Sequence, residues 1–216
     1  MNIHNITQGT PEWLSARSGV ITASMFSTAR DRLKSGAPSA AAKAYAFRVA
    51  IERLGGLPLD GGNDTWAMKR GRELEPAARA RHSEAINEPI EMAGFATTDC
   101  GKYGASPDCL IGTAGMAEYK CLVAPDRIAR VVLDGDISEF EDQIQGQMWV
   151  WGRQWVDFCV YLPQLVNAGM DLYKRRVYRD EAYIDKLASD LKAFDVVVQT
   201  NVFKLRANFG GKVEVF

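Results

Sequence analysis

The segment 106–120 constrains the fold more than any other part of the chain, because its spacing is typical of a β-hairpin that carries charged side chains. The run Gly112-Thr113-Ala114-Gly115 is compatible with a turn, so the chain can fold back on itself there. Alternate side chains of a strand share a face, which places Glu118 and Lys120 together and the residue between them on the other face. The sequence therefore predicts that Asp108, from the neighbouring strand, lies beside Glu118.

These residue types match the needs of phosphodiester hydrolysis. The reaction uses a hard divalent cation, which prefers carboxylate and carbonyl oxygens to thiolate or imidazole ligands. Asp108, Glu118 and the backbone carbonyl of Tyr119 meet that preference. Magnesium is the expected ion, and manganese can substitute because both favour octahedral oxygen coordination. Lys120 is placed to orient an activated water. The alternative for this triplet taken alone is an exposed ion pair on a surface hairpin, because 25% of the residues are charged.

The bulk composition indicates one folded domain, residues 1–216. With 47% apolar residues the chain can bury one substantial core. A charged-then-apolar leader is missing, as is any run of about 18 apolar residues, so we expect a cytoplasmic protein that does not span a membrane.

Charge and metal-ligand counts exclude several function classes. The four cysteines have neither the C-x-x-C spacing of a zinc site nor that of an iron–sulfur nuclease, and only His4 and His82 offer imidazoles. A formal net charge of −1 argues against indiscriminate coating of DNA, so any DNA contact must be local. One candidate basic patch is formed by Arg30, Arg32 and Lys34.

The order of predicted elements indicates an α/β fold in which helices flank a central mixed sheet. Helices are predicted after the caps Thr10 and Ser39, around residues 66–75 with a kink or interruption at Pro76, and from about Asp180. An S-x-x-E capping box, Ser138 with Glu141, is predicted to start a helix that ends near Trp151 and whose residues Gln143 and Gln147 share one face. The predicted strands are 90–97, 103–106, 109–111, 116–123 and 155–160, with 175–178 pairing to the last.

Four sequence motifs, in this order, resemble the lambda-type phage exonucleases, the YqaJ-like viral recombinases of the PD-(D/E)xK nuclease superfamily. The similarity runs from about residue 12 to about residue 161. The motifs are Glu12-Trp13-Leu14-Ser15-Ala16-Arg17-Ser18-Gly19-Val20-Ile21-Thr22-Ala23-Ser24, Glu75 within Gly71-Arg72-Glu73-Leu74-Glu75-Pro76-Ala77-Ala78-Arg79, Ser106-Pro107-Asp108 with Glu118-Tyr119-Lys120, and Gln143-Ile144-Gln145-Gly146-Gln147-Met148-Trp149.

The resemblance implies a restriction-endonuclease-like nuclease core and a specific reaction. Linear double-stranded DNA with a 5′-phosphate would be digested 5′ to 3′ on one strand to mononucleotides, leaving a 3′ single strand for annealing. Glu75 would help hold a second metal ion or its water, giving two Mg²⁺ per site. Met68 would be a wedge between terminal bases, and Lys34 a groove contact. The residues implied to line a 5′-phosphate pocket are Arg17, Ser24, Ser106 and Gln143.

The resemblance also implies partners, and other readings stay open. Such proteins form ring-shaped homotrimers, work with a phage single-strand annealing protein, and are encoded by phages or prophages in a bacterial host. Enclosure of DNA by a ring would explain how a nearly neutral chain stays bound.

One alternative function is that of a restriction or structure-selective endonuclease of the same superfamily, using Asp108, Glu118 and Lys120. Another is a DNA-binding module that does not hydrolyse its ligand.

Overall fold

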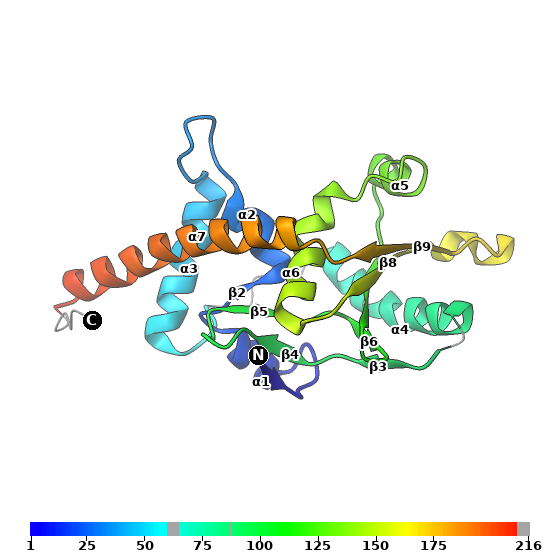
Figure 1. Cartoon of the computed structure of the whole chain (residues 1–216), viewed down its shortest axis with the longest axis horizontal. Coiled ribbons are helices and arrows are strands. Elements are labelled where there is room, and N and C mark those ends of the chain that lie inside the picture. The colour runs from blue at the N-terminus through cyan, green and yellow to red at the C-terminus, as the bar shows by residue number, and fades with distance from the viewer. Residues whose placement is uncertain (60–64, 87, 211–216) are drawn as a thin grey trace.

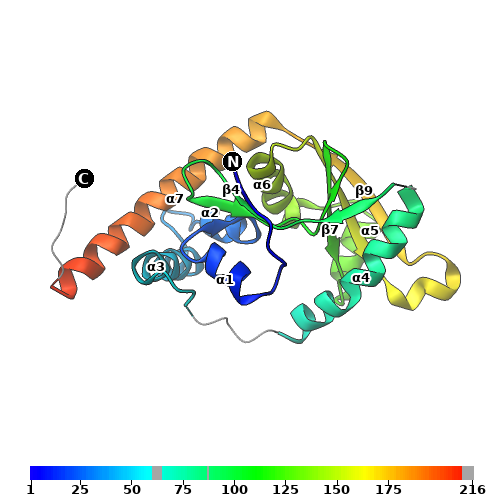
Figure 2. The ribbon, with the colours of Figure 1, turned by 90° about the horizontal axis from the view of Figure 1, so that it is seen from below.

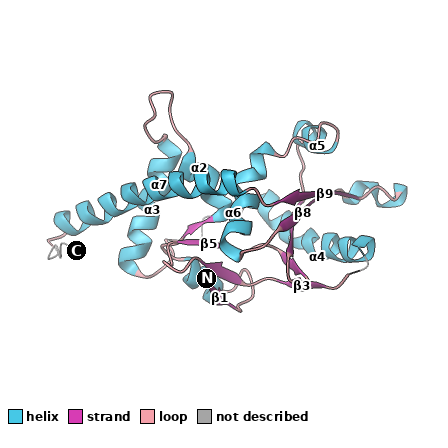
Figure 3. Ribbon diagram, viewed as in Figure 1, coloured by secondary structure: helices cyan, strands magenta, loops and turns pink. Residues whose placement is uncertain are grey.

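A computed structural model of the chain describes residues 1–59, 65–86 and 88–210, which form two mixed sheets surrounded by helices (Figure 1). The helices are α1 (Pro11–Arg17), α2 (Phe26–Arg30), α3 (Ala40–Gly55), α4 (Trp66–Ile86), α5 (Pro125–Val132), α6 (Glu141–Trp151) and α7 (Glu181–Asn208), with short 3-10 turns η1 (Ala23–Met25), η2 (Ser138–Phe140) and η3 (Pro163–Ala168). Helices lie on both sides of the strands (Figure 3). The predicted α/β class, with helices flanking a mixed sheet, is confirmed.

The larger sheet has five strands in the order β3-β6-β7-β8-β9, and the smaller has four in the order β1-β4-β5-β2. The larger sheet contains β3 (Ile90–Met92), β6 (Cys109–Ile111), β7 (Gly115–Lys120), β8 (Trp155–Tyr161) and β9 (Leu172–Tyr178); the smaller contains β1 (Asn2–His4), β2 (Ile21–Thr22), β4 (Phe95–Thr97) and β5 (Tyr103–Ala105). β7 pairs antiparallel with β6 and parallel with β8. Because parallel neighbours need a crossover, the chain leaves β7, passes through α5 and α6, and returns in β8.

Strand β7 divides two packing layers, as the two-residue period predicts. Met116 belongs to the main core, which includes Ile144 and Met148 of α6. Ala117 and Tyr119 face a second apolar cluster, to which α4 contributes Ala78. α4 runs along the sheet near β7 and β9, away from α6 (Figure 2). The two helices therefore cover opposite faces of β7.

Several predicted helix ends are confirmed by their caps. The side chains of Thr10, Ser39 and Asp180 each accept a hydrogen bond from a backbone N–H in the first turn of the helix that follows. α3 ends before Gly56, whose φ of 67° is in the left-handed region that favours glycine. Pro76 lies inside α4, which continues to Ile86, so of the two predicted effects of this proline, a kink or an interruption, the interruption is wrong.

The predicted capping box at the start of α6 is also wrong. Ser138 lies in η2, and α6 begins at Glu141. Neither the start of η2 nor the start of α6 has a hydrogen bond to a capping side chain. Instead, Asp136 accepts a hydrogen bond from the backbone N–H of Ser138 at 2.9 Å. The preceding turn thus provides the acceptor that we expected from Ser138. The predicted end of the helix at Trp151 is confirmed.

The predicted single strand 90–97 consists of two strands that belong to different sheets. β3 pairs with β6, whereas β4 pairs with β1 and β5. Between them, Gly94 lies so close to the N-terminal segment that a Cβ there would be 2.2 Å from the carbonyl oxygen of His4. The chain crosses from one sheet to the other at this contact. The strand predicted for residues 116–123 likewise ends at Lys120.

None of the described helices is both long enough and apolar enough to cross a membrane.

We predict that Gly146→Ala lowers the free energy of unfolding by about 1–3 kcal/mol, because overpacking a filled core has that cost. A Cβ at Gly146 of α6 would lie 2.5 Å from ring carbons of Phe26, which is fully buried. Gly71→Ala in α4 is the matched control, since nothing lies within 4 Å of a Cβ there and alanine favours helix by up to about 1 kcal/mol. Urea unfolding measures the free energy of unfolding of both variants. Equal stability of the two variants would contradict this account of the α6–α2 contact.

Candidate active site

The β6–β7 hairpin brings Asp108 next to the strand that carries Glu118, as predicted. Asp108 directly precedes β6, and its backbone N–H donates to the carbonyl of Ala117 at 3.2 Å. In return, the backbone N–H of Tyr119 donates to Asp108 Oδ2 at 2.6 Å. Glu118 is 4% exposed. The two carboxylates therefore share one largely buried site at the end of the hairpin.

Glu118 is held by three donors, two of which come from helix α6. Lys120 Nζ lies 2.7 Å from Oε1, and Gln143 Nε2 donates to the same oxygen at 2.7 Å. Gln147 Nε2 donates to Oε2 at 2.6 Å. Lys120 also donates to Gln143 Oε1 at 3.0 Å. Both oxygens of Glu118 are thus oriented by neutral amides and one cation.

Gln147 is a site residue to which the sequence analysis assigned no role. Its side chain is 1% exposed, and its Oε1 has no hydrogen-bond partner among the described residues. The sequence did contain a signal, because Gln143 and Gln147 are four residues apart and one of them was expected to face the site. The same helical spacing puts the second amide on the same carboxylate.

Burial, together with repulsion between carboxylates, disfavours the ionised forms of Asp108 and Glu75. Burial raises the pKa of Asp108 well above its usual range, and the charges of Glu118 and Glu75 raise it further, whereas the Tyr119 N–H and Lys120 act in the opposite direction. Burial likewise raises the pKa of Glu75, with opposing effects from Arg79 and Glu118. The donors present do not neutralise these carboxylates, so the site favours an additional positive charge.

Lys120 keeps its proton in this setting. Burial by itself lowers the pKa of an ammonium group, but the charge and hydrogen bond of Glu118, together with the charge of Asp108, outweigh burial and raise the pKa of Lys120. Lys120 therefore supplies a fixed positive charge and hydrogen-bond donors rather than a base.

Glu75 reaches the site from α4, on the other side of the hairpin. Its carboxylate pairs with Arg79 four residues later at 3.4 Å, and its pKa responds to Glu118. Within the described residues, no three His, Cys, Asp or Glu side chains already converge as a metal-ligand group. A cation fits this site through the chemistry of its oxygen donors and its unbalanced negative charge, not through a preformed cage.

Two of the four residues predicted for a terminal-phosphate pocket are linked through Trp13. The Trp13 indole N–H donates to Ser106 Oγ at 2.9 Å, and the guanidinium of Arg17 lies over the same ring, 4.0 Å from its centroid. The pKa of Arg17 is lowered to about 10 by burial. In the described part of the chain Arg17 makes no ion pair, so its charge is available to a ligand.

The other two predicted pocket residues have different neighbours. Ser24 Oγ lies 3.5 Å from the hydroxyl of Thr22, and Gln143 is engaged with Glu118 and Lys120. The structure therefore joins Arg17 to Ser106 and Gln143 to the carboxylates. Ser24 and Gln143 have no direct contact with Arg17 among the described residues.

Met68 and Lys34 both lie on the surface. Met68, in the first turns of α4, is 54% exposed, which excludes ordinary core packing for it. Lys34 is exposed in the loop between α2 and α3, which projects from the body (Figure 1). Neither residue contacts the carboxylate site.

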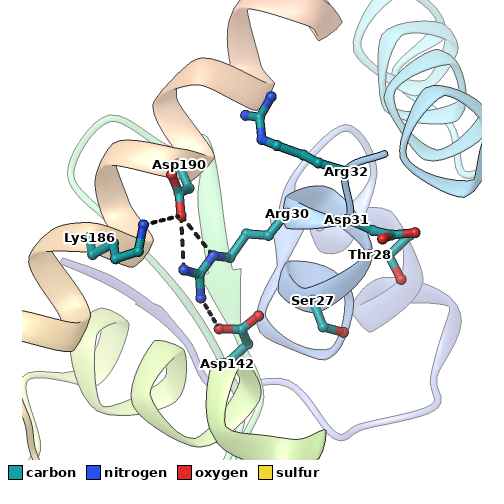
Figure 4. A pocket seen from close by; sticks show the side chains of 8 residues that line it. All are labelled: Ser27, Thr28, Arg30, Asp31, Arg32, Asp142, Lys186 and Asp190. Atoms are coloured by element: carbon teal, nitrogen blue, oxygen red, sulfur yellow. Dashed lines mark hydrogen bonds and ion pairs between the residues drawn. The ribbon is translucent and has the colours of Figure 1, made fainter. Parts of the chain in front are cut away.

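Arg30, expected to belong to a DNA-binding patch with Lys34, is neutralised by other residues. It lines an open groove of about 660 Å³ between α2 and α7, where Asp142 and Asp190 bind its guanidinium, the latter at 2.9 Å (Figure 4). Lys186 approaches Asp190 at 3.8 Å. The groove is lined by both acidic and basic side chains. The expectation that Arg30 contributes to a DNA-binding patch is therefore wrong, because its ion pairs connect α2 to α6 and α7.

Comparison with known proteins gives the family. Residues 12–154 match the model of the YqaJ-like viral recombinase domain. No curated protein sequence matches significantly. Among solved structures, an alkaline exonuclease, LHK-Exo from Laribacter hongkongensis, is 32% identical with a TM-score of 0.80, covering 93% of this chain and 98% of that one. The same enzyme in complex with dAMP gives 31% identity and a TM-score of 0.82 over 93% and 98% of the two chains.

A phage-related exonuclease from Haemophilus somnus 129PT shares the fold, at 15% identity and a TM-score of 0.65 over 88% of this chain and 96% of that one. The family match spans most of the chain, including the carboxylate hairpin. The chain therefore belongs to the YqaJ-like viral recombinase family and is a nuclease with a PD-(D/E)xK-type core.

Proposed function

We propose that this nuclease digests one strand of linear double-stranded DNA in the 5′ to 3′ direction, in a reaction that depends on Mg²⁺. Mononucleotides are released and a 3′ single strand remains for annealing. The observation that carries this proposal is the buried pairing of Asp108 and Glu118 next to Lys120, whose excess negative charge calls for a cation. The similarity to alkaline exonucleases supports exonucleolytic rather than internal cleavage.

The cation would be held by the carboxylates of Asp108 and Glu118 and the carbonyl of Tyr119, with Glu75 helping to hold a second ion or its water. Mn²⁺ can substitute for Mg²⁺ because the donors are all oxygens. When bound, such an ion lowers the pKa of a coordinated water and draws charge from the phosphate oxygens. Gln143 and Gln147 orient Glu118.

Direction would come from recognition of a terminal 5′-phosphate by Arg17, Ser106, Ser24 and Gln143. A terminal phosphate has more negative charge than an internal one, and a guanidinium can bind it with two hydrogen bonds. Arg17 is suited to this role because its stacking on Trp13 fixes its position and no carboxylate forms an ion pair with it in the described part of the chain. Met68 would separate the terminal bases and Lys34 would contact the duplex groove.

Assembly and partners follow the same proposal. By resemblance to the lambda-type phage exonucleases we infer a ring-shaped homotrimer. Enclosure of the DNA would explain how a chain of net charge −1, which has little general attraction for phosphates, stays bound. A phage single-strand annealing protein would take up the 3′ strand, in the cytoplasm of a bacterial host of the phage or prophage.

The decisive experiment compares linear duplex with closed circular duplex, each incubated with Mg²⁺ and with chelator. We expect mononucleotides from the linear DNA with Mg²⁺ and no product in the other reactions. Cleavage of the circle would instead identify an endonuclease. Binding without hydrolysis under every divalent ion would identify a DNA-binding module.

Asp108→Asn should lower the rate more than about 100-fold, since a metal ion supplies several kcal/mol of transition-state stabilisation. The amide oxygen can still accept the Tyr119 N–H. In chelator, the variant should unfold at the same or a higher temperature than the unchanged chain, because the ionised form of Asp108 is disfavoured by burial and repulsion. Retained turnover, or a large loss of thermal stability, would refute the assignment.

Arg17→Ala should reduce the preference for 5′-phosphorylated ends about 10- to 100-fold, the value of one charge-assisted hydrogen bond pair. The measurement is initial rate on matched duplexes ending in phosphate or hydroxyl. Arg206→Ala, an exposed arginine in the last turn of α7, serves as the control. An equal fall on both kinds of end would reject the pocket role of Arg17.

A further inference from the structure

A buried polar network lies behind the proposed metal site, on the opposite face of β7 from Glu118 and Lys120. His82 of α4 and Asp157 of β8 are both 0% exposed. His82 Nδ1 lies 3.0 Å from the hydroxyl of Tyr119, and His82 Nε2 lies 3.3 Å from Asp157 Oδ2. The apolar cluster around them includes Ala78, the buried cysteines of β6 and β8, and Tyr161.

Every member of this network is satisfied, which fixes its geometry. Arg176 of β9 binds both oxygens of Asp157, at 2.8 and 2.9 Å, and lies 3.6 Å from the centroid of the Trp155 ring. A carboxylate only accepts, so Nε2 of His82 carries the proton and Nδ1 accepts from the Tyr119 hydroxyl. The hydrogen bonds thus connect α4, β7, β8 and β9 at one point.

Burying these polar groups is costly compared with filling the same space with apolar side chains. What a fully satisfied network supplies is a unique position for the groups it joins. Here the joined group is Tyr119, and its backbone is part of the site on the other face. Its N–H donates to Asp108 Oδ2 at 2.6 Å, and its carbonyl is the third ligand in the proposed metal set.

We propose that His82 and Asp157 are positioning residues for the metal site: through the Tyr119 hydroxyl they fix the backbone whose N–H holds Asp108 and whose carbonyl faces the cation. This inference rests on the proposed function. It assigns to His82 of α4 and Asp157 of β8 a role in fixing the backbone of Tyr119, which is a different role from that of the charged motif residues. Removal of the hydrogen bond between the Tyr119 hydroxyl and His82 keeps every proposed metal ligand in the chain but makes the positions of those ligands less fixed.

The test is Tyr119→Phe, which removes only the hydroxyl and keeps the ring and the backbone. Mn²⁺ binding is measured by titration calorimetry on the full chain without DNA, and kcat and KM are measured on linear duplex at fixed Mg²⁺. We expect Mn²⁺ to bind about 10-fold more weakly, the lower end of the effect of outer-shell partners. The value of kcat should fall while KM for DNA stays unchanged.

Tyr161→Phe is the matched control. Tyr161 belongs to the same cluster, and its hydroxyl has no hydrogen bond among the described residues. It should bind Mn²⁺ as the unchanged chain does. An equal loss in Tyr161→Phe would reduce the effect to packing and overturn the inference, as would normal Mn²⁺ binding by Tyr119→Phe.

A double variant separates positioning from general destabilisation. His82→Gln can still donate to Asp157 from its amide but loses the acceptor that faces Tyr119. If both variants act through that one bond, His82→Gln with Tyr119→Phe binds Mn²⁺ as weakly as either alone. Losses that multiply would overturn the inference, and His82→Gln keeps the test available should Tyr119→Phe fold poorly. If the unchanged chain binds no Mn²⁺, the metal proposal itself fails and this inference fails with it.

Discussion

The structure depends on unequal compensation of two buried carboxylates. Glu118 receives hydrogen bonds from Lys120, Gln143 and Gln147, whereas the side chain of Asp108 accepts its hydrogen bond from the backbone N–H of Tyr119. Burial and the neighbouring charges raise the pKa of Asp108, so its ionised form needs a further cation. This imbalance supports the proposal that the site binds a hard divalent ion, the property that a metal-dependent nuclease requires.

The fold creates this imbalance by giving the two faces of β7 to different helices. α6 brings neutral amides to Glu118, while α4 brings Glu75 towards the site at one position and His82 to the opposite face at another. Amides orient a carboxylate without neutralising it, so they fix its geometry and leave its charge available for the proposed cation. One face of β7 therefore carries the charged residues Glu118 and Lys120, and the other face carries the Tyr119 side chain that His82 holds in position.

Local sequence signals predicted the local features, and long-range packing decided the rest. The hairpin that joins Asp108 to Glu118 has its turn within the segment, and the caps Thr10 and Ser39 act within one helical turn, so all could be predicted. The capping box at Ser138 failed because Asp136 supplies the competing acceptor. His82 could be counted but not placed, because its partners are 37 and 75 residues away in the chain. The role of Gln147 could not be predicted because it depends on how α6 packs against β7, which brings its amide to Glu118.

Ion pairing divides the arginines into those whose charge is compensated by carboxylates and those whose charge is not. Arg30 is bound by two carboxylates and Arg176 by Asp157, so neither charge is available to a phosphate. Arg17 is different, since an aromatic ring rather than an acid holds it, and stacking leaves the guanidinium edge able to donate hydrogen bonds. Under the proposed function, a guanidinium without an ion pair distinguishes a terminal phosphate by its additional negative charge, a distinction that a broad basic surface would not make. The proposed enclosure of the duplex and the proposed binding of a 5′-phosphate by Arg17 would then be separable contributions, one to residence on DNA and the other to the register of cleavage.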